Sequence, residues 1–279
     1  MKKVVLSKTR IPNRYKLLRV LVPALALPLI IIAAPFGGYM GVADAASAST
    51  VTLCSQYQAL PVATGSGNYI VKNNNYGGQA ECLSNANGGA NFTVTSSSAS
   101  NASPQAPAAY AEIFRGCHWG FCTSNSGLPL QVSSLGNPRT SWSTTQGASG
   151  EWDAAYDIWF NQTSTTSGQP NGAELMIWLN SNGTPAIPAG SPTVTINGIR
   201  YYFIESLRTS GTVSWPLLSY IRVNPGATSV SKLGINNFVQ DSVTRGYIQP
   251  SMYLISVEAG FEIWNGGIGL ETKSFSLTP

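Results

Sequence analysis

Residues 174–179 read Glu-Leu-Met-Ile-Trp-Leu, and this stretch has the apolar and polar alternation of a half-buried β-strand. Successive side chains of a strand point to opposite faces of the sheet. Glu174, Met176 and Trp178 therefore share one face, and the aliphatic residues between them share the other. A carboxylate in the middle of an apolar strand is costly to bury without partners, so its place here requires an explanation.

Two other stretches repeat this pattern of one acid and one tryptophan on the same face. Glu262 and Trp264 alternate with Phe and Ile, and Asp157 and Trp159 alternate with Tyr, Ile and Phe. If the three strands are neighbours, they gather three acids and three tryptophans on one concave face. Tryptophan rings stack on pyranose rings, and two facing carboxylates are what glycosidic cleavage requires. The alternative is a set of acids at solvent-exposed strand edges beside core tryptophans.

The remainder of the chain predicts an all-β domain. Short runs rich in β-branched and aromatic residues are separated by Asn, Gly, Pro and Ser. Asn197 and Gly198 stand between two such runs and are a strong signal for a two-residue hairpin. One segment, 232–245, has helical periodicity, with Asn236 or Asn237 as its N-cap. Many short strands with one short helix predict two stacked antiparallel sheets, a sandwich or jelly roll.

The first 45 residues read as a secretory signal peptide. A long basic segment precedes an apolar run over residues 20–34, and Ala43 to Ala45 form a small-x-small cleavage signature. Cleavage there would leave residues 46–279, which suit a single β-sandwich domain. The alternative is an uncleaved membrane anchor, because the weakly polar stretch is long enough to span a bilayer. Both interpretations export the domain, so we expect an extracellular protein.

The net positive charge of the chain comes from this leader. It holds seven of the 16 Lys and Arg but only one of the 12 acids, so the exported part carries nine basic and eleven acidic residues. The net positive charge therefore gives no case for nucleic-acid binding. A surface rich in Ser, Thr, Asn and Gly suits a neutral polysaccharide. We expect no protein partner, and we expect a monomer.

The four cysteines lie in the exported part, where disulfides form. Four cysteines allow three connectivities. We favour Cys54–Cys82 and Cys117–Cys122, because each bond then closes a local loop. One histidine in the whole chain makes a metal site improbable on composition, and no Gly-rich phosphate loop follows a strand. We therefore expect neither a metal nor a cofactor.

Five motifs in this chain resemble those of glycoside hydrolase family 12, and they keep that family's order. The stretch 174–178 looks like the nucleophile motif, and 260–270 looks like the acid/base motif. The stretch 155–160 resembles the strand of the family's assisting aspartate. The other two are similar to an early sugar-binding strand and to the disulfide loop of bacterial members, at 69–77 and 116–123.

The resemblance implies a β-jelly roll, a concanavalin-like sandwich of two curved antiparallel sheets with a cleft on the concave side. It also implies a retaining endo-β-1,4-glucanase, a cellulase that cleaves internal bonds of cellulose and related β-glucans by double displacement. Residues 46–279 would be the catalytic domain. Glu174 would be the nucleophile and Glu262 the acid/base, and Asp157 would hydrogen-bond Glu174 and assist it.

The same motifs suggest which residues bind the sugar chain. Trp119 and Trp142 each remain open between sugar platform and core, and the family more often has tryptophan at Tyr76. Residues 85–105 match the family poorly, so cleft residues there cannot be placed. The substrate-binding residues that we expect are Asn74, Tyr76, His118, Trp119, Met176, Trp178 and Trp264.

Two alternatives stay open. Glu258 has the same strand parity as Glu262 and is the rival acid, although a bulge at Gly260 could break that alternation. The substrate could be xyloglucan or mixed-linkage glucan, or the chain could be a secreted glucan-binding sandwich without catalysis, because a fold does not fix a function.

Overall fold

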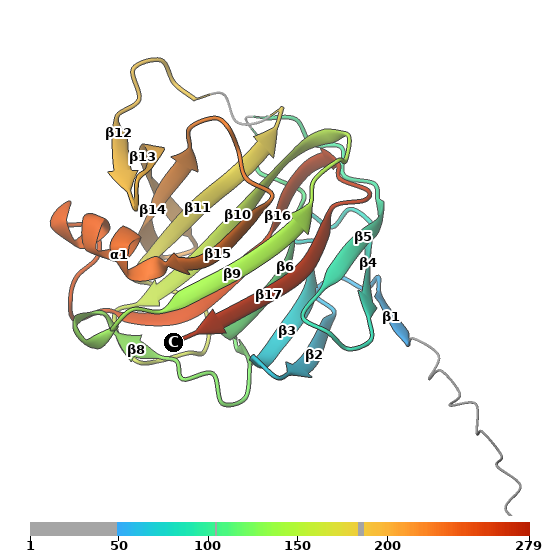
Figure 1. The fold of residues 1–279 in the computed structure, drawn as a ribbon, viewed down its shortest axis with the longest axis horizontal. Coiled ribbons are helices and arrows are strands. Elements are labelled where there is room, and N and C mark those ends of the chain that lie inside the picture. The colour runs from blue at the N-terminus through green and yellow to red at the C-terminus, as the bar shows by residue number, and fades with distance from the viewer. Residues whose placement is uncertain (1–48, 104, 184–186) are drawn as a thin grey trace, which may run out of the picture. The chain divides into compact units, whose positions relative to one another are not determined.

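The structure is a computed structural model that describes residues 49–103, 105–183 and 187–279. These residues form two β-sheets and one α-helix (Figure 1). The predicted leader and its cleavage signature lie outside the described residues. Within the part of the chain that is described, no helix is long and apolar enough to cross a membrane.

The smaller sheet has six strands in the order β1-β4-β5-β17-β9-β15. All of its pairs are antiparallel, and the C-terminal strand β17 lies in its interior, between β5 and β9. The strands are β1 (Thr50–Leu53), β4 (Glu81–Ala86), β5 (Phe92–Ser97), β9 (Arg139–Thr145), β15 (Ser229–Gly234) and β17 (Glu271–Thr278).

The larger sheet has the main order β12-β13-β14-β11-β10-β16-β6-β3-β2, with β7 paired to β6 and β8 paired to β16. A 3-10 turn, Val132–Ser134, follows β8. The strands are β2 (Ala59–Thr64), β3 (Gly67–Asn74), β6 (Ala109–His118), β7 (Phe121–Cys122), β8 (Leu130–Gln131), β10 (Gly150–Asn161), β11 (Ala173–Asn182), β12 (Thr193–Ile196), β13 (Ile199–Ser210), β14 (Val213–Arg222) and β16 (Tyr253–Gly266).

The all-β sandwich predicted from the sequence is confirmed, with one departure from fully antiparallel pairing. β11 and β14 run parallel, with Glu174 opposite Leu217. The chain leaves β11, builds the β12–β13 hairpin at the sheet edge, and returns as β14 beside β11. β14 is antiparallel to β13, and it enters the sheet in the same direction as β11.

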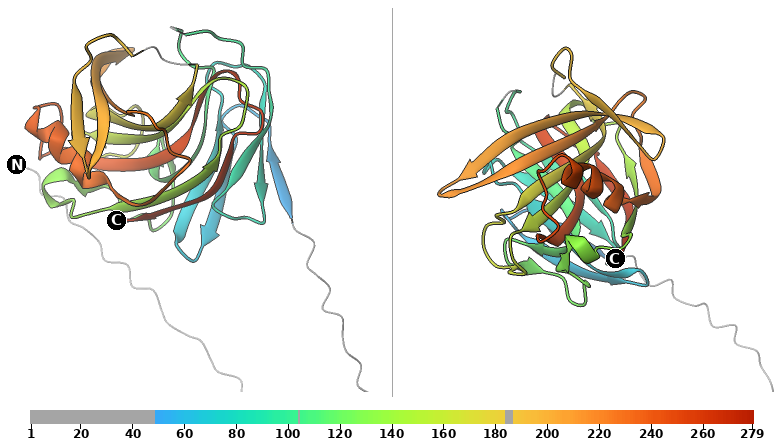
Figure 2. Two further views of the ribbon diagram at one scale, coloured as in Figure 1. Left: turned by 45° about the horizontal axis from the view of Figure 1, so that its top comes forward. Right: turned by 90° about the vertical axis from the view of Figure 1, so that its left-hand side faces the viewer.

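The hydrophobic core lies between the two sheets. Tyr156, from the face of β10 that points to the smaller sheet, packs edge-on against Trp142 of β9 at 5.3 Å between ring centroids. Phe261 of β16 contacts the same Trp142 and also Phe92 of β5. Trp142 is thus a core residue, not a sugar platform. Figure 2 shows the two layers curving together.

Local turn signals are reproduced, but the start of the helix is not. Asn197 and Gly198 have φ values of 53° and 77° and join β12 to β13, as the hairpin signal predicts. The helix α1 spans Ile235–Thr244, and its N-cap is Gly234, without a side-chain cap bond. The expectation of an Asn236 or Asn237 cap is wrong, because β15 pairs with β9 up to Gly234.

Both favoured disulfides are present. One bond joins Cys54, just after β1, to Cys82 in β4. The other joins Cys117 in β6 to Cys122 in β7 across a short loop. This second bond closes the loop that carries Trp119, whose φ of 44° is in the left-handed region.

Gly260 allows β6 and β16 to approach at the centre of the larger sheet. A Cβ at Gly260 would stand 2.3 Å from the carbonyl oxygen of Ala111 and 3.0 Å from the ring of Tyr110. The Tyr110 hydroxyl donates to the carbonyl of Ala155 on β10, at 3.1 Å, so the tyrosine spans β16. We infer that glycine is needed at this position for the tyrosine to reach β10.

We predict that Gly260→Ala destabilises the fold by about 1–3 kcal/mol, because the clash involves a strand backbone that cannot move alone. Denaturant unfolding followed by fluorescence measures this change. The matched control is Gly65→Ala, where an added Cβ meets no atom within 4 Å. Equal stability of the two variants would contradict the packing argument.

Candidate active site

The concave face of the larger sheet contains a cleft with a volume of about 910 Å³. Strands β3, β6, β10, β11, β13, β14 and β16 all contribute side chains to its lining. All ten residues that the sequence assigns to the catalytic and substrate-binding sets lie on this lining. They are Asn74, Tyr76, His118, Trp119, Asp157, Glu174, Met176, Trp178, Glu262 and Trp264.

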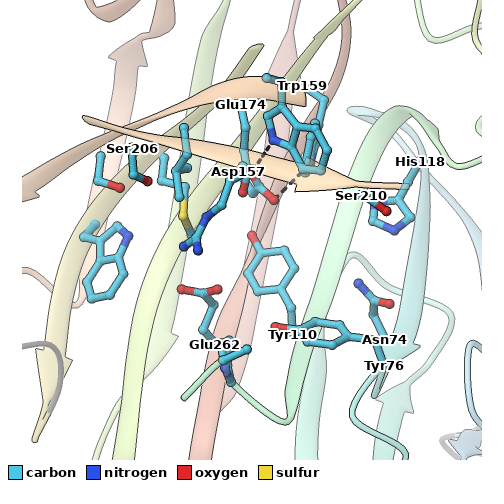
Figure 3. A pocket seen from close by; sticks show the side chains of 18 of the residues that line it. Asn74, Tyr76, Tyr110, His118, Asp157, Trp159, Glu174, Ser206, Ser210 and Glu262 are labelled. Carbon is cyan, nitrogen blue, oxygen red and sulfur yellow. Dashed lines mark hydrogen bonds between the residues drawn. The ribbon is translucent and has the colours of Figure 1, made fainter. Parts of the chain in front are cut away.

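The predicted strand alternation places the two glutamates in the same cleft. Glu174 is on β11 and Glu262 is on β16, and β10 lies between these two strands. Strands two places apart in a sheet are roughly 10 Å apart at their backbones, so their side chains can converge. Figure 3 shows both carboxyl groups directed into the cleft.

The Glu174 carboxyl group is held by a tryptophan that the sequence did not single out. Trp215 Nε1 donates to Glu174 Oε2 at 2.7 Å. Burial raises the pKa of Glu174 to about 7, whereas the Trp215 hydrogen bond lowers this pKa and the neighbouring Glu262 raises it. Glu174 is therefore a carboxyl group with one fixed donor and a second acid in reach.

Glu262 is paired with a buried acid on the adjacent strand. The Glu262 backbone N–H donates to Asp153 Oδ1 at 3.4 Å, and Asp153 is fully buried. Burial raises the pKa of both acids, and Glu262 raises that of Asp153 further. A hydrogen bond from Asp153 lowers the pKa of Glu262. Two neighbouring carboxyl groups disfavour double ionisation, which favours the retention of a proton by the pair.

Asp157 does not make the contact that was expected of it. Its Oδ2 accepts a hydrogen bond from Trp159 Nε1 at 2.9 Å, and its Oδ1 is buried without a partner. The expected bond to Glu174 is absent, and Trp215 supplies the donor to Glu174 instead. Burial, together with the charges of Glu174 and Glu258, raises the pKa of Asp157 well above its usual range.

Glu258, the rival acid, is excluded from the cleft lining by its own partner. β16 pairs with β6 in an unbroken register, so no bulge occurs at Gly260 in that ladder and Glu258 keeps the parity of Glu262. However, both Glu258 oxygens contact His118 Nδ1, at 2.9 and 3.0 Å, and the side chain is fully buried. Glu262, in contrast, lines the cleft.

His118 links Glu258 to the buried ion pair between Lys72 and Glu112. Its Nε2 lies 3.7 Å from Glu112 Oε1, and Lys72 Nζ lies 3.6 Å from the same oxygen. Burial lowers the pKa of His118 to about 4 and raises that of Glu258 to about 7. Two carboxylates and an imidazole could in principle hold a cation, but the Lys72 ammonium already balances charge there.

The aromatic side chains of the cleft differ in how much surface they present. Tyr76 and Trp119 are 40% and 37% exposed, which leaves their rings available to a ligand. Trp178 and Trp264 are almost buried and pack together, with ring centroids 6.3 Å apart. The first pair is suited to stacking, whereas the second presents little ring surface to the cleft.

Three residues of the site escaped the sequence analysis. Asp153 shares the odd-numbered parity of Asp157 on the same strand, so alternation alone could have found it. Trp215 has no such signal, because its contact depends on the parallel pairing of β14 with β11. Tyr110, opposite Glu262 on β6, also lines the cleft.

Comparison with known proteins identifies the family. The sequence profile of glycosyl hydrolase family 12 matches residues 67–278. The chain belongs to glycosyl hydrolase family 12. It is therefore a glycoside hydrolase, and the family indicated by the five motifs is confirmed.

Solved structures of family 12 enzymes share its fold. Endoglucanase cel12A from Rhodothermus marinus is 43% identical, with a TM-score of 0.73 over 82% of this chain and 98% of that one. A metagenome-derived family 12 endoglucanase is 40% identical, with a TM-score of 0.74 over 82% and 97%. A family 12 xyloglucanase from Bacillus licheniformis is 27% identical, with a TM-score of 0.71 over 82% and 99%.

Proposed function

We propose that this chain is a retaining endo-β-1,4-glucanase in which Glu174 is the nucleophile and Glu262 is the acid/base. The observation that carries the proposal is the convergence of these two carboxyl groups in one cleft, from strands on either side of β10. Retaining glycosidases need two carboxyl groups about 5–5.5 Å apart. Glu174 and Glu262 each also have a hydrogen-bonding partner suited to the proposed role.

The first step forms a covalent glycosyl-enzyme. Glu174 attacks the anomeric carbon, and the C–O bond to the leaving group breaks while Glu262 gives its proton to the leaving oxygen. In the second step Glu262 takes a proton from water, the water oxygen bonds to the anomeric carbon, and Glu174 leaves as a carboxylate. Two inversions give net retention.

The surroundings of the two acids support these roles. The indole donor at Glu174 favours the ionised form that a nucleophile needs. Glu262 shares its site with buried Asp153, so this pair keeps a proton available for the leaving group. Burial and the charges of Glu174 and Glu258 raise the pKa of Asp157. A protonated Asp157 would assist by limiting the number of negative charges around Glu174.

The cleft supports a linear β-glucan as substrate. Tyr76 and Trp119 offer exposed rings, and Asn74 offers an amide on the same lining. The two more similar solved structures are described as endoglucanases, which favours cellulose and related unbranched chains. The similarity to a xyloglucanase is lower, so xyloglucan is the second candidate. A binding protein without catalysis would not need both Glu174 and Glu262.

We also propose that the protein acts outside the cell as a monomer. Two disulfides in the described domain suit an oxidising compartment. The basic and apolar leader with its small-residue cleavage signature suits export.

We predict that Glu174→Ala and Glu262→Gln each lower hydrolysis of carboxymethyl-cellulose by at least about a thousandfold, because each removes one of the two acid functions. Reducing-sugar assays measure the rate, and circular dichroism checks the fold. Glu205→Gln, on an exposed part of β13, is the control. Near-normal activity in either folded variant would end the assignment.

We predict that Asp153→Asn extends activity to higher pH. The Asp153 carboxyl lowers the pKa of Glu262, and an amide is a weaker donor to a carboxylate, so the pKa of Glu262 should rise. Glu262 then keeps its proton to higher pH, and the alkaline limb of the kcat/KM profile moves to higher pH. Asp241→Asn, on the helix α1, is the control. An unmoved or lowered alkaline limb would contradict the pairing.

A further inference from the structure

The β13–β14 hairpin brings two side chains with N–H donors to the cleft. Arg208 on β13 and Trp215 on β14 are cross-strand partners, so they share one face of the hairpin, and both line the cleft. Ser206 and Ser210 of the same strand also lie on the lining, where Figure 3 shows them. In the right-hand view of Figure 2 the hairpin, in orange, extends beyond the neighbouring strands.

Trp215 is locked in place by packing rather than free to rotate. Its side chain is 8% exposed, and its ring centroid lies 5.8 Å from that of Trp159. Trp159 in turn packs edge-on against Trp119 of the disulfide loop, at 4.9 Å. Glu174 lies directly opposite Trp159 on β10 and opposite Leu217 on β14, so the two indoles flank it. The donor is therefore preorganised before any substrate arrives.

The chemistry of an indole makes this contact directional. The indole N–H donates and cannot accept, so it stabilises a carboxylate more than a carboxylic acid. The other indole, Trp159, serves Asp157 and not Glu174. The Arg208 guanidinium adds a positive charge that lowers the pKa of Glu174 and Glu262, but Arg208 is exposed and its charge is screened by solvent. The direct hydrogen bond to Glu174 is thus the specific element.

We propose that Trp215 is a positioning residue for the reaction: it holds Oε2 of Glu174 so that Oε1 faces the anomeric carbon, and it stabilises the carboxylate that leaves in the second step. This inference rests on the proposed role of Glu174. In that second step the bond between the anomeric carbon and Glu174 breaks, the electron pair returns to the carboxylate, water bonds to the carbon, and Glu262 takes the water proton. Negative charge reappears where the indole N–H already points.

The test is Trp215→Phe, which keeps an aromatic ring against Trp159 and removes the N–H. Loss of one hydrogen bond to a charged group should lower kcat by roughly ten- to a hundredfold. The pKa of Glu174 should rise without its donor, so the acidic limb of the kcat/KM profile should move to higher pH. With aryl cellobiosides that have good leaving groups, deglycosylation should become the slower step, seen as a burst of released phenol.

Trp142→Phe is the matched control, because it removes an indole N–H that donates to Thr272 in the core. It should lower stability and leave the acidic limb unmoved. If Trp215→Phe folds poorly, replacing Trp215 by 3-benzothienylalanine, which has sulfur in place of the N–H, keeps the shape and carries the same expectation.

The outcomes separate this inference from the proposed function. An inactive Glu174→Ala together with a wild-type rate and acidic limb in the Trp215 variants would overturn the role of Trp215 and leave Glu174 as nucleophile. Substantial activity in Glu174→Ala would overturn both. A shifted limb and slowed deglycosylation in the Trp215 variants, with neither change in Trp142→Phe, support the inference.

Discussion

The position of β10 between β11 and β16 is the constraint on which the cleft depends. All three strands bury one face against the smaller sheet, through Tyr156, Ile177 and Phe261 among others. Because side chains alternate with a period of two, the same packing directs Glu174 and Glu262 to the opposite, concave face. A slip of one residue in any of these strands would exchange its acid for a core side chain. The hydrophobic core therefore determines the direction of the two carboxyl groups proposed as catalytic.

The concentration of acids on this face would be unfavourable without dedicated donors. Indole N–H groups serve Glu174 and Asp157, an imidazole serves Glu258, and a backbone N–H serves Asp153. Burial and mutual repulsion raise the pKa of these acids, which favours the retention of protons in the cleft. Glycosidic cleavage requires one protonated and one ionised carboxyl group in the same site. The surroundings of the acids provide both forms.

Sequence alone could predict the parts of this site that depend on local alternation. The pairing of an acid with a tryptophan two or four residues later, on the same strand face, placed Glu174, Glu262 and Asp157 on the cleft, and Asn197-Gly198 marked a hairpin correctly. Trp215 could not be predicted, because its bond to Glu174 depends on β14 returning parallel to β11 after a long excursion. Nothing local encodes that neighbour. The bond expected between Asp157 and Glu174 is not formed, because each acid has a tryptophan donor instead: Trp159 on the same strand for Asp157, and Trp215 on β14 for Glu174.

The central claim is that Glu174 forms a covalent bond to the sugar. Incubation with a 2-deoxy-2-fluoro cellobioside carrying a good leaving group slows the second step and allows the intermediate to accumulate. Mass spectrometry of a peptic digest then locates the adduct. We predict a single glycosylated peptide that contains Glu174, with the sugar on that carboxyl group. Attachment to another residue, or rapid turnover without any adduct and with inversion at the anomeric carbon, would contradict the account.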